Sequence, residues 1–145
     1  MQFISINQNN SIAIQKGRLV LLDKKLNIIE KGDKLFNSLL YSIGIFRRLL
    51  RYFIYSSLRL SEEEVLVSIK KGLYLINEKT LQVKRIKTSD GFSKTLYLHK
   101  IQHNDSTYVI YSNYFSNVNM LPLEIYIAPI NDLNLFRKIY TFEEG

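Results

Sequence analysis

The stretch VSIKKGLYLINEKTLQVKRIK, residues 67–87, decides the fold. Apolar residues alternate with others on both sides of a short polar turn, which predicts two antiparallel strands joined as a hairpin. A related stretch, GRLVLLDKKLNII at residues 17–29, carries the same apolar alternation around the turn Asp-Lys-Lys. A weaker third version, EIYIAPINDLNLFRKIY, occupies residues 124–140. The hairpin therefore recurs along one chain.

The three hairpins align residue by residue. Leu19, Leu21 and Asp23 correspond to Leu73, Leu75 and Asn77, and after the turn Leu26 and Ile28 correspond to Leu81 and Val83, with one residue inserted. In the third version Ile125 and Ile127 lead into a turn around Asn131, Asp132 and Asn134, and Phe136 and Ile139 follow it. The spacing is 54 residues from Leu21 to Leu75 and 52 from Leu75 to Ile127.

A strand repeat near 50 residues is typical of propeller blades. A blade with two apolar faces cannot bury them alone, so blades stack face to face. Any antiparallel sheet also contains hairpins, but the near-constant spacing favours repeats. We therefore expect a mainly β protein, a partial β-propeller of about three antiparallel blades with one amphipathic helix.

The chain of 145 residues is expected to form a single domain. The blade-like repeats are predicted at about 11–35, 58–88 and 95–142, and the helix at about 37–55. Apolar residues in that segment follow helical spacing, and Arg47, Arg48 and Arg51 occupy the remaining surface. Three arginines in mid-segment argue against a transmembrane helix, while an amphipathic helix on an anionic membrane stays open.

The composition excludes several kinds of site. The chain has no cysteine, which excludes disulfides and thiolate metal sites. His99 and His103 have the i, i+4 spacing of a zinc pair on a helix, but they lie in an alternating, strand-like segment without an acidic helical partner. We expect no metal site and no cofactor.

The net charge of +7 is compatible with nucleic acid, an anionic surface or an acidic glycan. The lysines are scattered through turns and alternating segments, however, and no nucleic-acid-binding motif is evident, so a solvated face is favoured and nucleic acid is not. The opening MQFISINQNNSIAIQ lacks the pattern of a signal peptide, which predicts a cytoplasmic protein.

Four segments together resemble one family: YSIGIFRRLLRYFI, EVLVSIKKGLYLIN, YSNYFSN and IYIAPINDLNLFRKIYTFEEG. In this order they resemble the N-terminal part of sialidase-like propellers with Asp-box repeats. The resemblance covers residues from about 11 to the end, and implies about three blades, roughly half of a ring. The box pattern Ser-x-Asp-x-Gly-x-Thr-Trp is a folding element, and here Asp132 stands for its aspartate and Phe136 for its tryptophan. The serine, glycine and threonine are absent.

A second departure lies in residues 111–117, where Ser112 and Asn113 replace the Gly-Glu of relatives. Tyr114, Phe115 and Asn117 remain. Because the segment keeps an aromatic ring and amides, the resemblance implies a ligand pocket formed by Tyr114, Asn113 and Asn117.

Catalysis is not favoured. A retaining sialidase needs an arginine cluster, a tyrosine nucleophile with a glutamate base, and an aspartic acid, contributed by blades around the whole ring. Arg47, Arg48 and Arg51 lie on the predicted helix, and Glu62, Glu63 and Glu64 read as a solvated loop. No carboxylate pair is identifiable as a glycosidase dyad.

Four hypotheses stay open. The favoured one is a non-catalytic propeller portion that binds a glycan or a protein. The second is a glycoside hydrolase fragment completed by a partner chain or by self-association, since half a ring leaves sheet faces uncovered. The third is a basic surface-binding module that uses Arg47, Arg48, Arg51 and Arg59. The fourth is a product without retained activity.

Overall fold

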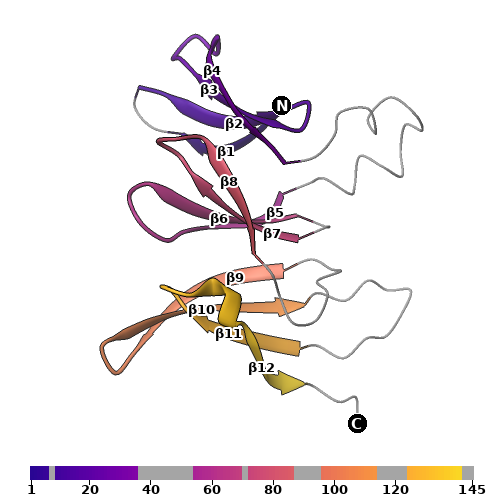
Figure 1. The fold of residues 1–145 in the computed structure, drawn as a ribbon, viewed down its shortest axis with the longest axis vertical. Helices are drawn as coiled ribbons and strands as arrows, with labels where there is room; N and C mark the ends of the chain where they lie inside the picture. Colours follow the sequence, from indigo (N-terminus) through magenta and orange to yellow (C-terminus); the bar gives the residue numbers. More distant parts are fainter. Residues whose placement is uncertain (7–8, 36–53, 70–71, 87–95, 114–123, 142–145) are drawn as a thin grey trace, which may run out of the picture.

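The structure, a computed structural model, describes residues 1–6, 9–35, 54–69, 72–86, 96–113 and 124–141. These residues form three separate four-stranded antiparallel sheets, which lie one above another in Figure 1. In each sheet neighbouring strands are consecutive in the chain, so each sheet is a meander. A mainly β fold with three antiparallel units is therefore confirmed.

The strands have the following bounds. The first sheet contains β1 (Gln2–Ile6), β2 (Ser11–Gln15), β3 (Arg18–Leu22) and β4 (Ile28–Lys34). The second contains β5 (Ile54–Arg59), β6 (Glu64–Ile69), β7 (Gly72–Asn77) and β8 (Gln82–Ile86). The third contains β9 (Leu96–His103), β10 (Ser106–Asn113), β11 (Glu124–Pro129) and β12 (Arg137–Thr141), with a short 3-10 turn, η3 (Leu133–Leu135), before β12.

The three aligned hairpins occupy equivalent places. Leu21 lies in β3, Leu75 in β7 and Ile127 in β11, and each of these is the third strand of its own sheet. The repeat seen in the sequence is thus the third and fourth strands of three successive sheets. The first sheet also includes β1, which precedes the predicted repeat at 11–35.

Two apolar clusters join the sheets. We call the side of a sheet that faces the next sheet along the chain its forward face, and the side that faces the preceding sheet its rear face. The outer side of the first sheet is accordingly a rear face, and the outer side of the third sheet is a forward face. The forward face of the first sheet, with Ile12, Ile14 and Leu19, packs on the rear face of the second. The forward face of the second sheet packs in the same way on the rear face of the third. All residues from Val65 to Ile69 in the second sheet are consequently buried.

An aromatic group anchors the second cluster. Tyr111 of β10 is fully buried, and its ring stacks on Tyr126 with centroids 4.6 Å apart. Phe136, which follows η3, meets the ring of Tyr111 edge to face at 4.8 Å and is 4% exposed. Aromatic pairs at these distances stabilise beyond their burial. Phe136 thus reaches the second cluster directly after the turn of the third hairpin.

Polar contacts add to both joints. Across the first, Asp33 donates its backbone N–H to the carbonyl of Leu81, 2.9 Å away, and accepts from the N–H of Val83 at 2.9 Å. A Cβ on the neighbouring Gly32 would lie 2.4 Å from the Leu81 carbonyl oxygen, so only glycine permits this approach. Across the second joint, the Leu98 N–H donates to Ser56 Oγ at 3.2 Å.

The helix predicted at 37–55 is wrong at its C-terminal end. Residues 36–53 lie outside the described part of the chain, but Ile54 begins β5 and pairs with Ile69. The described residues contain no α-helix. A run of aromatic and β-branched residues, YFIY at 52–55, also suits a strand, and Ile54 packs against the first cluster.

Candidate functional site

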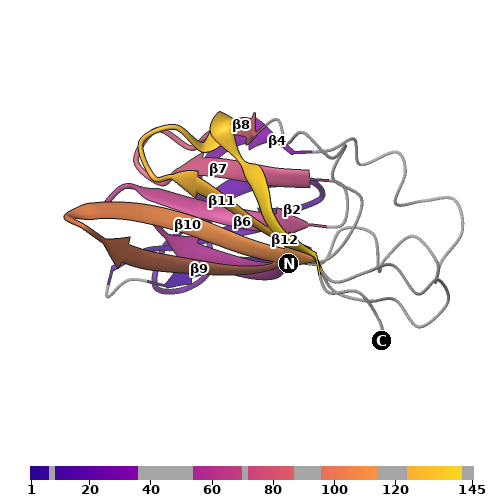
Figure 2. The same cartoon turned by 90° about the horizontal axis from the view of Figure 1, so that it is seen from below.

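The chain connections gather at two ends of the stack. Because each sheet is a meander, its connections alternate between opposite ends of the strands. We call one end the turn end; its strands are joined by residues 7–10, 23–27, 60–63, 78–81, 104–105 and 130–136. The other is the connection end, where the strands are joined by residues 16–17, 35–53, 70–71, 87–95 and 114–123. Figures 1 and 2 show the strand ends of all three sheets pointing to the same two sides.

Of the predicted ligand residues, only Asn113 belongs to the described part of the chain. Asn113 is the last residue of β10 and pairs with Leu96 at the start of β9. Tyr114 and Asn117 follow it in the chain and lie outside the described residues, as do Arg47, Arg48 and Arg51 of the predicted basic surface. A pocket formed by Tyr114, Asn113 and Asn117 therefore stays a prediction.

The turn end is ordered by side chains that bind the backbone. Asp23 Oδ1 accepts from the N–H groups of Lys25 and Asn27, each at 2.8 Å. Asn77 Oδ1 accepts in the same manner from Lys79 and Thr80, at 3.0 and 2.9 Å. Such Asx turns stabilise a local reversal of the chain. Asp23 and Asn77 are equivalent positions in the alignment of the first two hairpins.

The third turn uses the same device. Asp132 Oδ1 accepts from the N–H of Asn134 at 3.2 Å, and its carbonyl accepts from Leu135 at 3.2 Å. The residue that the resemblance matched to the Asp-box aspartate therefore holds its turn. In the first turn, hydrogen bonds from the Asn27 side-chain amide, then from the backbone N–H of Asn27, hold the pKa of Asp23 below its ordinary range.

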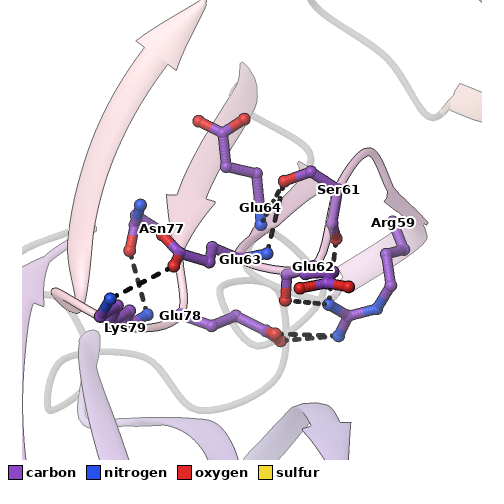
Figure 3. Close-up of polar contacts among 8 residues, drawn as sticks. All are labelled: Arg59, Ser61, Glu62, Glu63, Glu64, Asn77, Glu78 and Lys79. Atoms are coloured by element: carbon purple, nitrogen blue, oxygen red, sulfur yellow. Dashed lines mark hydrogen bonds and ion pairs between the residues drawn. The ribbon is translucent and has the colours of Figure 1, made fainter.

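Arg59, which the basic-surface hypothesis included, ties turns together (Figure 3). Its guanidinium meets both carboxylate oxygens of Glu78, at 3.0 and 2.9 Å. It also donates to the carbonyls of Ser61 and Glu62, at 3.3 and 3.1 Å. Arg59 Nη2 thus contacts both Glu78 oxygens while Nη1 contacts the two carbonyls, so this one guanidinium joins two neighbouring turns. Glu62 and Glu63 are exposed beside it, and Ser61 Oγ accepts from the N–H groups of Glu63 and Glu64.

A cleft of about 220 Å³ lies between the second and third sheets at the turn end. Leu60, Leu75, Ile86 and Leu133 supply apolar lining, and Glu64, Lys84 and Asp132 supply charged lining. This cleft is not predictable from the sequence, because its lining comes from four separate segments and only the stacking of two sheets brings them together. The lining of this cleft is more polar than apolar, and such a mixture of charged, amide and apolar groups can hold a small polar ligand.

A second ion pair fixes the edge of the third sheet. Glu124 accepts from the Tyr126 hydroxyl at 2.6 Å and from Lys138 Nζ at 2.9 Å. The Tyr126 hydrogen bond first, and that of Lys138 second, hold the pKa of Glu124 below its ordinary range. The contact between Glu124 and Lys138 joins β11 to β12.

His99 and His103 both lie in β9 and are exposed. Within the described ranges, no three His, Cys, Asp or Glu side chains come close enough together to hold a metal ion. The same residues include no helix with the length and apolar character needed to cross a membrane.

Comparison with known proteins gives no relative for this chain: no family model, no curated protein and no solved structure matches it, so its likeness to sialidase-like propellers stays a prediction.

Proposed function

We propose that this chain is a non-catalytic, propeller-like module that binds an acidic glycan at its connection end. The observation that supports the proposal is the common direction of the strands, because the segments that join them at one end are basic in sequence. In the three stacked sheets, the strand ends on either side of the three longest connections, 35–53, 87–95 and 114–123, lie at one end. That end also receives the aromatic and amide residues expected to line a pocket.

The connection end is strongly basic in sequence. Its segments contain eight basic residues and one acidic residue, Asp90. The basic residues are Lys16, Arg47, Arg48, Arg51, Lys70, Lys71, Lys87 and Lys94. The excess equals the whole net charge of +7, so the rest of the chain is balanced.

The turn end has the opposite character. Its turns contain three basic residues, Lys24, Lys25 and Lys79, against six acidic ones. The acidic residues are Asp23, Glu62, Glu63, Glu78, Asp105 and Asp132. The lysines look scattered along the sequence, yet basic residues are in excess in the segments that join strands at the connection end, and acidic residues are in excess in the turns of the other end. Separation of charge attracts an anionic ligand to one end and disfavours it at the other.

The predicted pocket residues suit a sugar ligand. Asn113 ends β10 at the connection end, and Tyr114 and Asn117 follow it in the β10–β11 connection. Amides hydrogen-bond to hydroxyl groups, and an aromatic ring offers an apolar surface to a sugar face. Basic residues in the neighbouring connections supply partners for carboxylate or sulfate groups.

Two lysine pairs provide a matched test. Lys70 and Lys71 join β6 to β7 at the connection end, whereas Lys24 and Lys25 lie in the β3–β4 turn at the turn end. We expect Lys70→Gln with Lys71→Gln to weaken binding to acidic glycans on an array by at least about tenfold, because charge-assisted hydrogen bonds are lost. Lys24→Gln with Lys25→Gln removes the same charge and is expected to leave binding unchanged.

The array contains neutral and acidic glycans, and single-stranded nucleic acid is measured at the same salt concentration. Equal weakening by both pairs would show that net charge alone drives binding. Preference for nucleic acid over every acidic glycan would make the ligand class wrong, and binding to none of them would refute the proposal.

A glycoside hydrolase is the second candidate, and one observation favours it. Glu64 and Asp132 both line the cleft at the turn end, and glycosidases use two carboxyl groups. Release of a fluorogenic aglycone, abolished by Glu64→Gln, would establish it. Asp132 is already engaged by the backbone of its own turn, which is why binding without turnover is the preferred proposal.

A further inference from the structure

The cleft between the second and third sheets has a floor that belongs to the hydrophobic core. Its apolar lining residues are all members of the second cluster or pack against it: Leu60, Leu75, Ile86, Ile130 and Leu133. The first three come from the second sheet and its β5–β6 turn, and the last two come from the β11–β12 turn of the third sheet. Because core side chains are closely packed, a floor built from them keeps its shape. The cleft is therefore a preformed hollow with an apolar base.

The strand register directs two side chains of opposite charge into the cleft from the second sheet. Leu75 pairs with Leu66 of β6 and with Lys84 of β8, so these three residues share the forward face. Glu64 lies two residues before Leu66 in β6 and is therefore on the same face. Glu64 and Lys84 thus flank β7 from its two neighbouring strands, and both line the cleft.

The third sheet contributes a carboxylate and two amides. Asp132, Asn131 and Asn134 line the cleft from the β11–β12 turn. Asp132 Oδ1 accepts from the N–H of Asn134 at 3.2 Å, whereas its Oδ2 has no described partner. Amide groups donate and accept hydrogen bonds. The cleft consequently combines two carboxylates, one ammonium group and two amides around an apolar base.

The charged groups of the cleft form no ion pair in the part of the chain that the structure describes. The ion pairs found there are Arg59 with Glu78, Lys79 with Glu63, and Lys138 with Glu124. The side chains of Glu64 and Lys84 have neither a hydrogen-bond nor an ion-pair partner among the described residues. Figure 3 shows the Glu64 carboxylate directed away from the pair of Arg59 and Glu78. Unpaired groups of both signs in one cleft suit a ligand that carries both charges.

We propose that this cleft binds a small zwitterion, a free α-amino acid with an apolar side chain. The ammonium group of the ligand pairs with Glu64 and Asp132, its carboxylate pairs with Lys84, and its side chain lies on the apolar base. The cleft volume of about 220 Å³ is below the range of about 300–1,000 Å³ of sites for drug-sized ligands, which limits the ligand to a small molecule. The excess of acidic residues at the turn end favours a ligand with an ammonium group over a simple anion.

Three ligands with the same carbon skeleton test the need for both charges. Free leucine carries both groups, isoamylamine lacks the carboxylate, and isocaproate lacks the ammonium group. We expect leucine to bind at millimolar concentration or below, and each analogue to bind at least about tenfold more weakly, because a charge-assisted contact is lost. Amide NMR signals followed during each titration give the affinity. Equal binding of isoamylamine and leucine, or no binding of any free amino acid at millimolar concentration, would overturn the proposal.

The same NMR signals show where the ligand binds. Leucine is expected to shift the signals of Glu64, Lys84 and residues 131–134, and to leave that of Asn113 at the connection end unchanged. The proposed acidic glycan is expected to do the reverse, so the inference stands or falls independently of glycan binding. Shifts produced by leucine at the connection end alone would place its site elsewhere and refute the inference.

Four substitutions separate the cleft from the net charge of the turn end. Glu64→Gln and Lys84→Gln are each expected to weaken leucine binding by at least about tenfold, because each removes one ionic partner. Glu62→Gln and Lys79→Gln remove the same charges from turns at the same end of the second sheet, at residues that do not line the cleft. These two controls are expected to bind leucine as the wild type does. Equal weakening in the controls would contradict the assignment of the site.

A charge reversal distinguishes loss of the site from loss of the fold. Lys84 is exposed, so Lys84→Glu is compatible with folding. The change removes the partner of the ligand carboxylate and adds a third acid, so this variant is expected to bind isoamylamine more tightly than leucine, the reverse of the wild type. An unfolded variant could not gain affinity for the amine. An unchanged preference for leucine would show that Lys84 does not hold the carboxylate, and the proposed site would then be wrong.

Discussion

Gly32 shows how one residue sets the distance between two sheets. A Cβ at this position would lie 2.4 Å from both the Cβ and the carbonyl oxygen of Leu81, and the oxygen belongs to the backbone of the next sheet. We expect Gly32→Ala to destabilise the fold by about 1–3 kcal/mol, because the joint must open to admit the methyl group. Urea unfolding measures the change, with the exposed Glu30→Ala in the same strand as control. Equal stability of the two variants would show that the approach is not needed.

Glu124 gives the third sheet a dependence on pH. Its folded-state pKa lies below the ordinary value because the ionised form accepts hydrogen bonds from Tyr126 and then from Lys138. A lowered folded pKa adds stability above the unfolded pKa, and this stability is lost as the pH falls through the folded pKa. The unfolding free energy of wild type should therefore approach that of Glu124→Gln as the pH is lowered from 6 to below about 4.

The measurement is a series of urea unfolding curves across that pH range. Tyr126→Phe keeps the ring in the core and removes only the hydroxyl, so it is expected to reduce the same pH dependence in part. A constant difference between wild type and Glu124→Gln at every pH would contradict the role of this carboxylate.

At the scale of the element, the turn between β7 and β8 depends on one side-chain oxygen. Asn77 Oδ1 accepts two backbone N–H groups, and Leu81 ends the turn with a φ of 55°. We expect Asn77→Ala to cost about 1 kcal/mol of unfolding free energy, and Asn77→Asp to cost much less because the acceptor is kept. Thermal unfolding compares the two, and equal losses would mean that the amide nitrogen, and not the oxygen, is needed.

The hairpins were predictable because local chemistry repeats in them. The alignment of Leu26 with Leu81 across an inserted residue is supported by the backbone, since these residues have similar positive φ values of 64° and 55°. Their environments differ completely: Leu26 is 56% exposed and Leu81 is 1% exposed. The sequence cannot show this difference, because Leu81 is covered by a strand from another sheet.

Other elements were less predictable. β1 was outside the predicted repeats because its pairing with β2 spans the polar NQNN stretch, which gives no hairpin signal such as Asn-Gly. The helical spacing before Ile54 obscured the start of β5, since apolar residues at 53 and 54 fit both periods. The cleft could not be predicted at all, since its lining depends on how two sheets stack.

For the whole molecule, the arrangement of sheets determines which residues can act together. Arg47 and Arg48 belong to the segment between β4 and β5, and Lys70 and Lys71 to the segment between β6 and β7; the direction of these four strands, which the sequence does not show, puts their adjoining ends on one side of the stack. Arg59, by contrast, belongs to the opposite end and holds Glu78. Sequence reasoning grouped Arg59 with the other arginines because residue type alone carries no information about strand direction.

The stacking also predicts where the molecule is most stable. β6 and β7 are central strands of the central sheet, so they are hydrogen-bonded on both edges and covered on both faces. Their amides can exchange with solvent only when both joints open, whereas those of β2, β3, β10 and β11 need one joint to open. We expect hydrogen exchange, measured at a concentration where the chain is monomeric, to be slowest in β6 and β7. Slower exchange in β10 and β11 than in β6 and β7 would contradict this prediction, because the stability of β10 and β11 would then not depend on packing against the second sheet.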